Sequence, residues 1–207
     1  MTEKLEIIFS KGGIMMIPLS ICSFLVILIA LERMLVLRKN RLLNPRYLKT
    51  WKSWFSNGME LNSLPVNGRT AIINQLLLPI VHHLPLSESK VEERLADISR
   101  KIKNRLERGL VYLDTIAGIA PLFGLLGTAL GMVEVFSRLS GAGETKMEAL
   151  SSGISEALYT TVTGLVIGIP ALIAYNLLSR QIDNLLIIAD EQVNELLSEF
   201  KNNIYQS

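Results

Sequence analysis

The chain has 207 residues, of which 49% are hydrophobic, and its formal net charge at pH 7 is +2. So high an apolar fraction is atypical of a soluble domain and indicates a membrane protein, and the small net charge gives no reason to expect nucleic-acid binding. The single cysteine, Cys22, cannot form a disulfide within the chain, and the adjacent His82 and His83 have no further metal ligands at a suitable spacing. We therefore expect no metal site and no cofactor.

The first apolar run covers residues 14–31, about the minimum length for a membrane-spanning helix. A cleaved secretory signal is the alternative, but no small-residue cleavage site follows the run and the positive charge comes after it. We therefore expect a retained helix. Basic residues cluster directly behind this run, whereas lysines and glutamates balance each other before it. By the positive-inside rule, residues 1–13 lie outside the cell membrane and residues 32–109 lie in the cytoplasm.

The polar segment 32–109 contains turn residues and two helical patterns. A helix is expected over 70–84, with a kink or stop at Pro79. Apolar residues then recur at steps of three and four over 91–106, which is typical of an amphipathic helix. Because only Gly109 separates this stretch from the next apolar run, we expect one helix that continues into the membrane.

Two further spans complete an all-α membrane protein with three transmembrane helices. They are expected over 110–136 and 155–179, with a polar outer loop over 137–154 between them. The helical apolar pattern continues into the tail, residues 180–207. We expect this cytoplasmic extension to pack against the amphipathic helix over 91–106.

Small residues recur along the second and third spans at spacings that let helix backbones approach closely. The positions that we expect to serve helix packing are Gly124, Gly127, Gly131, Gly164, Gly168 and Pro170. A helix that faces only lipid has no need of such residues. The two spans therefore predict a tightly packed helix pair or a helical pore.

Two threonines lie at comparable depth in these spans, Thr128 in the second and Thr161 in the third. At 1.5 Å per residue, each lies roughly 9–12 Å below the outer boundary of the membrane. The hydroxyls could form one polar layer in a channel, or each could donate to a carbonyl of its own helix and do nothing more. The residues alone leave both readings open.

Three carboxylates could serve a proton path, and none lies at mid-membrane. Glu134 has Arg138 four positions on, which indicates an interfacial ion pair, and Asp114 lies near the cytoplasmic end of the second span. Glu156 is expected at the start of the third helix, where the helix dipole favours a carboxylate; a role at a channel mouth is the alternative. If the chain forms a proton channel, the central carboxylate comes from another chain.

The residues of the two later spans resemble a known family. They read TIAGIAPLFGLLGTALGM over 115–132 and ISEALYTTVTGLVIGIPA over 154–171. Both closely resemble the two signature spans of the MotA/TolQ/ExbB proton-channel family, and the three-span organisation is nearest to its ExbB and TolQ branch.

This resemblance implies a ring of five subunits in the bacterial inner membrane, with the N-terminus in the periplasm and the C-terminus in the cytoplasm. A single-span partner of the ExbD or TolR type would thread the ring and supply the aspartate that carries the proton, and a TonB- or TolA-like protein would act beyond it. By motif position, Thr128 and Thr161 match the pore-facing threonines of the family, and Glu156 matches its acidic residue in the third span. Proton flow would then drive mechanical work on the cell envelope, in biopolymer or TonB-dependent transport.

Several alternatives stay open at the level of the sequence. A TolQ-type envelope-integrity subunit and a gliding motor have the same motifs, and the ion could be H⁺ or Na⁺. A non-conducting scaffold in the lipid bilayer would use the glycines for packing alone. An enzyme has little support, because no nucleophile–base pair or phosphate-binding loop occurs in the chain.

Overall fold

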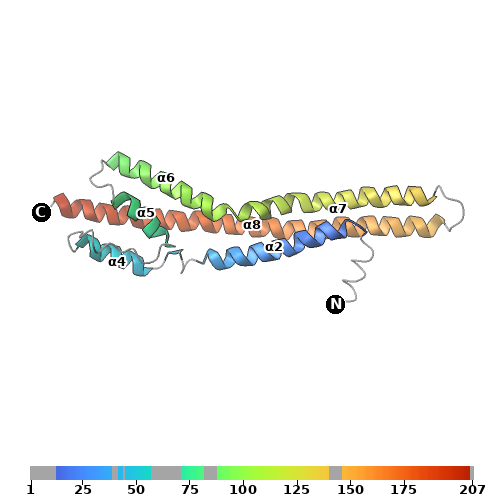
Figure 1. Ribbon diagram of the computed structural model, residues 1–207, viewed down its shortest axis with the longest axis horizontal. Coiled ribbons are helices and arrows are strands. Elements are labelled where there is room, and N and C mark those ends of the chain that lie inside the picture. Colours follow the sequence, from blue (N-terminus) through green and yellow to red (C-terminus); the bar gives the residue numbers. More distant parts are fainter. Residues whose placement is uncertain are drawn as a thin grey trace. The chain divides into compact units, whose positions relative to one another are not determined.

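The computed structural model describes residues 13–38, 42–43, 45–56, 71–81, 88–139 and 146–205. In these ranges the chain forms α-helices and no strand (Figure 1). The helices are α2 (Met16–Val36), α4 (Pro45–Ser56), α5 (Ile72–Val81), α6 (Glu88–Glu107), α7 (Leu110–Leu139) and α8 (Lys146–Tyr205). Three of them, α2, α7 and α8, are long and apolar enough to cross a membrane. The prediction of an all-α membrane protein with three transmembrane helices is confirmed.

The chain divides into two compact units. The first unit joins α2, as far as Glu32, to α7 and to the part of α8 that ends at Leu177. The second unit joins the residues from Arg33 to Arg108 to the rest of α8. The helix α8 is continuous through both, so the third span extends into the tail as the apolar pattern predicted.

The first unit holds the three apolar spans. Helix α2 buries one face, formed by Met16, Leu19, Cys22 and Val26 at steps of three and four residues. Its other faces are apolar but exposed in the single chain, and the same is true of the outer faces of α7 and α8. Apolar surface of this extent needs lipid or further subunits to cover it.

The second unit has its own core around α4 and α5. Trp51 and Trp54 of α4 are buried, and their rings meet edge to face with centroids 5.5 Å apart. The indole Nε1 of Trp51 donates a hydrogen bond of 2.7 Å to Oδ1 of Asn74, which is fully buried on α5. Because a buried amide without a partner would be costly, this bond makes the polar residue acceptable in the apolar core.

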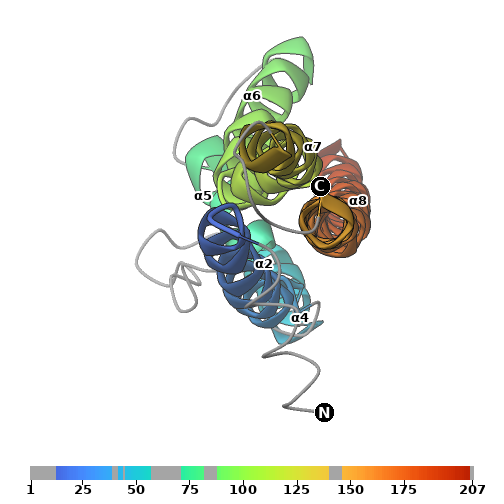
Figure 2. The same cartoon turned by 90° about the vertical axis from the view of Figure 1, so that its right-hand side faces the viewer.

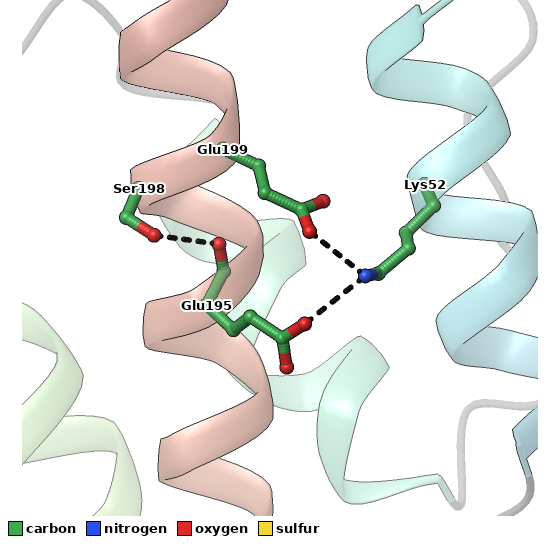
Figure 3. Close-up of polar contacts among 4 residues, drawn as sticks. All are labelled: Lys52, Glu195, Ser198 and Glu199. Atoms are coloured by element: carbon green, nitrogen blue, oxygen red, sulfur yellow. Dashed lines mark hydrogen bonds and ion pairs between the residues drawn. The ribbon is translucent and has the colours of Figure 1, made fainter.

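Polar contacts attach the tail of α8 to two other helices of this unit. On one side, Lys52 of α4 lies between Glu195 and Glu199, at 3.1 and 3.0 Å from their carboxylate oxygens (Figure 3). On the other side, Oγ of Ser99 on α6 donates to Asp190 at 2.7 Å. The tail therefore packs against α6, as the sequence pattern predicted.

The expectation of one helix running from 91 through the second span is wrong. Helix α6 ends at Glu107, residues 108–109 form a turn, and α7 begins at Leu110. Gly109 provides the physical reason, because glycine pays a large entropic cost in a helix and readily leaves it. The boundary between the polar segment and the second span accordingly lies at a break in the helix.

The polar stretch between the second and third spans is more helical than expected. Helix α7 continues to Leu139, and α8 already begins at Lys146, well before the predicted end of the loop at 154. Polarity alone suggested a loop, but the residues from Met147 to Leu150 are good helix formers. In the helix expected over 70–84, α5 continues past Pro79 to Val81, so the proline does not stop it, and residues 82–84 lie outside the described residues.

Candidate functional site

Helices α7 and α8 run side by side, and glycines set their closest approach (Figures 1 and 2). A Cβ atom added at Gly164 would lie 2.6 Å from the carbonyl oxygen of Ala120 and 3.1 Å from Cα of Gly124. A Cβ added at Gly124 would lie 2.9 Å from the carbonyl oxygen of Thr160. Since these neighbours are backbone atoms, they cannot move aside as a flexible side chain could.

The same contact continues in both directions along the helix pair. Toward one end, a Cβ at Gly168 would lie 2.9 Å from Cγ of Pro121. Toward the other end, a Cβ at Gly131 would lie 3.2 Å from Cβ of Ala157. All five glycines singled out in the sequence, at 124, 127, 131, 164 and 168, lie in one antiparallel interface, whereas Pro170 is exposed in the single chain.

Gly127 faces a residue that the sequence analysis did not single out. A Cβ at Gly127 would lie 2.5 Å from Oγ1 of Thr160, which is 1% exposed. The Thr160 hydroxyl donates to the carbonyl of Ala157 on its own helix at 2.8 Å. Thr160 is therefore the threonine that fills the contact. Its position three and four residues from Ala157 and Gly164 is the signal that could have indicated this.

Thr161 connects the two helices directly. Its Oγ1 donates a hydrogen bond of 3.1 Å to the carbonyl oxygen of Gly124 on α7. The side chain is half-buried in the single chain. A threonine that satisfies only its own helix would bond a carbonyl three or four residues back; Thr163, which donates to Tyr159 at 2.8 Å, does this.

Thr128 satisfies its own helix instead. Its Oγ1 donates to the carbonyl of Leu125 at 2.6 Å. Because Gly127 lies opposite Thr160 and Gly124 lies opposite Thr161, the antiparallel register sets Thr128 and Thr161 about one helical turn apart along the pair. Both hydroxyls donate their proton to a backbone carbonyl. Each hydroxyl oxygen can therefore act only as an acceptor toward a further hydrogen-bond donor.

The three carboxylates have different surroundings. Asp114 and Glu134 are exposed on α7, and the side chain of Arg138, the expected partner of Glu134, lies outside the described residues. Glu156 is half-buried, and its carboxyl group lies against Gly13, a residue that precedes α2. The helix-dipole reading of Glu156 is wrong, because α8 begins at Lys146 and the dipole effect falls off within the first turn.

No cluster of three or more potential metal ligands occurs among the residues that the structure describes. His82 and His83 lie outside those residues. The described site offers hydroxyls, carbonyls and one carboxyl group for hydrogen bonding within an apolar helix pair.

These features define a three-span helical membrane protein whose last two spans pack through glycines and carry hydroxyls at their contact. The chain belongs to the MotA/TolQ/ExbB proton channel family, whose model matches residues 71–191, more than half of the sequence.

Relatives of this family resemble the chain over different lengths. An ExbB-like biopolymer transport protein of Synechocystis sp. is 31% identical over 205 residues, which cover 92% of this chain and 78% of that protein. The biopolymer transport protein exbB1 of Vibrio cholerae is 27% identical over 208 residues, or 93% of this chain and 86% of its own. The Tol-Pal system protein TolQ of Haemophilus influenzae is 40% identical over 86 residues, or 42% of this chain and 37% of its own.

Proposed function

We propose that this chain is the channel-forming subunit of a proton-driven motor of the ExbB/TolQ type, rather than an enzyme or a passive scaffold. It would form a homo-oligomeric ring, a pentamer by analogy with the family, in the bacterial inner membrane. A single-span partner of the ExbD or TolR type would supply the membrane aspartate. Proton flow through this complex would do mechanical work on the cell envelope.

The observation that carries the proposal is the hydrogen bond from Thr161 to the carbonyl of Gly124. Because the hydroxyl proton is used in this bond, the hydroxyl oxygen can only accept a hydrogen bond from another group, such as one on a partner protein or a water molecule. Thr128 is bonded in the same sense. An acceptor-only hydroxyl suits a protonated carboxyl group or a water molecule, whereas an ionised carboxylate needs donors. The threonine face would thus stabilise the neutral form of a partner's aspartate while it moves through the membrane.

The orientation follows from the charges that flank the first span. The N-terminus and the segment between α7 and α8 would lie in the periplasm. The second unit would lie in the cytoplasm, where the basic cluster behind α2 belongs by the positive-inside rule.

The names of the relatives favour a role in biopolymer transport, since the two that align over most of this chain carry that description. A TonB-like protein would then receive the work. A Tol-type role in envelope integrity is the second candidate, because TolQ is 40% identical over 86 residues, a level close to the 39% over 93 residues of an ExbB protein of Salmonella typhimurium. In that case a TolA-like protein would be the recipient.

The test is purification of the protein from native membranes in a mild detergent, with the mass of the complex measured and its companions identified by mass spectrometry. We expect a multimer that carries a single-span protein with a membrane aspartate. The identity of a third companion would distinguish the transport role from the Tol-type role. A stable complex without any single-span partner would contradict the motor and favour a scaffold.

A further inference from the structure

Gly13, at the entry to α2, has a backbone conformation that favours glycine and lies against the carboxyl group of Glu156. Its φ is 60°, in the left-handed region, and its carbonyl accepts a hydrogen bond of 3.1 Å from the amide of Met16. A Cβ atom at this position would overlap Oε1 of Glu156 and would lie 3.0 Å from Cδ of the same carboxyl group. The left-handed turn favours glycine at residue 13, and the carboxyl group of Glu156 occupies the space that a side chain there would fill.

The contact joins parts of the first unit that are far apart in the sequence. Glu156 lies well inside α8, so neither a helix end nor a capping role explains where its carboxyl group lies. The carboxyl group rests instead on the bare backbone of Gly13. On α8, Glu156 lies one turn before Thr160 and close to Thr161, which forms the cross-helix bond to Gly124.

We propose that Gly13 is a positioning residue for Glu156. The backbone at the entry to α2 covers one side of the carboxyl group and thereby sets the direction in which it can exchange a proton. Any side chain at residue 13 displaces the carboxyl group from this position. The functional part of this inference rests on the proposed function, because it takes Glu156 to serve the proton path.

A crosslinking experiment tests the contact independently of any activity. In a Cys22→Ala background, the pair Gly13→Cys and Glu156→Cys is treated in native membranes with a short bismaleimide, and loss of both thiols is followed by mass spectrometry. We expect this pair to crosslink. The control pair replaces Glu156→Cys with Gly118→Cys, at a position where a Cβ meets nothing within 4 Å, and it should not crosslink. If both thiols of the first pair react singly but never with each other, the inference is overturned.

Proton flux tests the positioning role. The complex, with the companions that copurify, is reconstituted in lipid vesicles and driven by a pH gradient. We expect Gly13→Ala to lower the flux by about tenfold or more, since displacement of a functional group by about 1 Å can cost that much. Gly13→Asn should behave in the same way, because asparagine tolerates the left-handed conformation but still carries the Cβ atom. Normal flux in Gly13→Ala would overturn the proposal.

A double-mutant cycle separates contact from backbone strain. Shortening the carboxyl side chain by Glu156→Asp should remove most of the effect of Gly13→Ala, measured against Glu156→Asp alone. If the loss persists there and Gly13→Asn conducts normally, strain alone explains the effect and the positioning role falls. If Glu156→Gln conducts normally while the cysteine pair crosslinks, the contact stands, but the proposed role of Glu156 fails and the positioning role fails with it.

Discussion

At the scale of single residues, the two threonines differ in where their protons go. Thr161 donates across the helix pair to Gly124, whereas Thr128 donates to Leu125 of its own helix. A hydrogen bond between membrane helices contributes about 0.6 kcal/mol on average, because the unfolded chain in the membrane also finds partners. Loss of the Thr161 hydroxyl should therefore affect conduction much more than it affects stability.

We predict that Thr161→Val abolishes proton flux while the complex still assembles. Valine keeps the shape of threonine but removes the hydroxyl that, in the proposed function, would accept a hydrogen bond from a neutral carboxyl group. The loss of the bond to Gly124 should lower the free energy of unfolding by only about 0.6 kcal/mol. The measurement pairs flux in reconstituted vesicles with the mass of the complex in detergent. Thr161→Ser, which keeps the hydroxyl, is the matched control, and full flux in a Thr128→Val and Thr161→Val double variant would rule out the pore role.

A second residue-scale prediction concerns pH and lies outside the membrane spans. Burial raises the pKa of the Asp190 carboxyl group, and the hydrogen bond from Ser99 offsets part of that rise. A raised pKa means that the folded state binds the proton more tightly than the unfolded chain does. Protonation of Asp190 therefore stabilises the fold at low pH, and this contribution is lost as the pH rises through the folded pKa.

The variant Asp190→Asn should accordingly raise Tm near neutral pH, where the native carboxylate is ionised and partly desolvated. Asparagine can still accept the hydrogen bond from Ser99 through its amide oxygen. The advantage over the unmodified protein should shrink as the pH falls through the raised pKa of Asp190 toward the ordinary range of aspartate, and it should be gone below that range. Thermal unfolding of the purified complex across pH measures this difference, and a lower Tm for the variant at neutral pH would show that the charge itself is favourable there.

The sequence predicted some of these residues and missed others for a physical reason. Glycines at steps of three and four predict close packing from the sequence alone, because helix geometry places them on one face. Whether the Thr161 hydroxyl donates to a carbonyl of its own helix or to one on α7 depends on how closely the backbone of α7 approaches, which the sequence does not show. The contact between Gly13 and Glu156 depends on how α2 enters the unit, which no local pattern contains. Thr160 was missed although its spacing from Ala157 and Gly164 places it on the small-residue face, because the sequence analysis considered only the glycines of that face.

At the scale of elements, the pair α7 and α8 depends on backbone contact rather than on side-chain interlocking. Without water to exclude from between the helices, association in a membrane relies on close van der Waals packing, and glycine permits the closest approach. The contact at Gly164 is the tightest to backbone atoms, because a Cβ atom added there would lie 2.6 Å from the carbonyl oxygen of Ala120.

We predict that Gly164→Ala separates α7 from α8 and destabilises the complex by about 1–3 kcal/mol, the usual cost of overpacking. The measurement is thermal unfolding of the purified complex, together with size-exclusion chromatography of the assembly. Gly118→Ala is the control, because a Cβ there meets nothing within 4 Å in the chain and alanine favours a helix. Equal stability of the Gly164→Ala and Gly118→Ala variants would show that the helix pair is not held at this contact.

Element boundaries show the limit of pattern reasoning. The long apolar helices were predictable because bilayer thickness requires their length and composition. The break at residues 108–109 was not, because Gly109 can be tolerated within a helix or can end one. The early start of α8 was hidden by the polarity of its first turns, since polarity reports exposure to water and not backbone conformation.

At the scale of the whole molecule, the chain combines a unit built of apolar spans with a unit that has a conventional buried core. The second unit buries Trp51, Asn74 and most of α5, and its ion pairs lie at the surface. Ion pairs of this kind contribute little to stability, so the apolar core holds this unit together. A unit with a core of its own is suited to an aqueous compartment, and the basic residues behind α2 indicate which side of the membrane that is.

The orientation gives the last prediction. In a Cys22→Ala background, single cysteines at Gly143 and at Ser198 should lie on opposite sides of the membrane, because the third span separates them in the sequence. A membrane-impermeant maleimide applied to cells whose outer membrane has been made permeable should label Gly143→Cys at once. It should label Ser198→Cys, which is exposed on α8, only after the inner membrane is opened. The reverse pattern would place the basic cluster behind α2 outside, against the positive-inside rule, and would turn Glu156 and Gly13 toward the cytoplasm. Protons driven inward would then meet Asp114 before the threonines, so the labelling result decides at which end of the proposed path Glu156 would act.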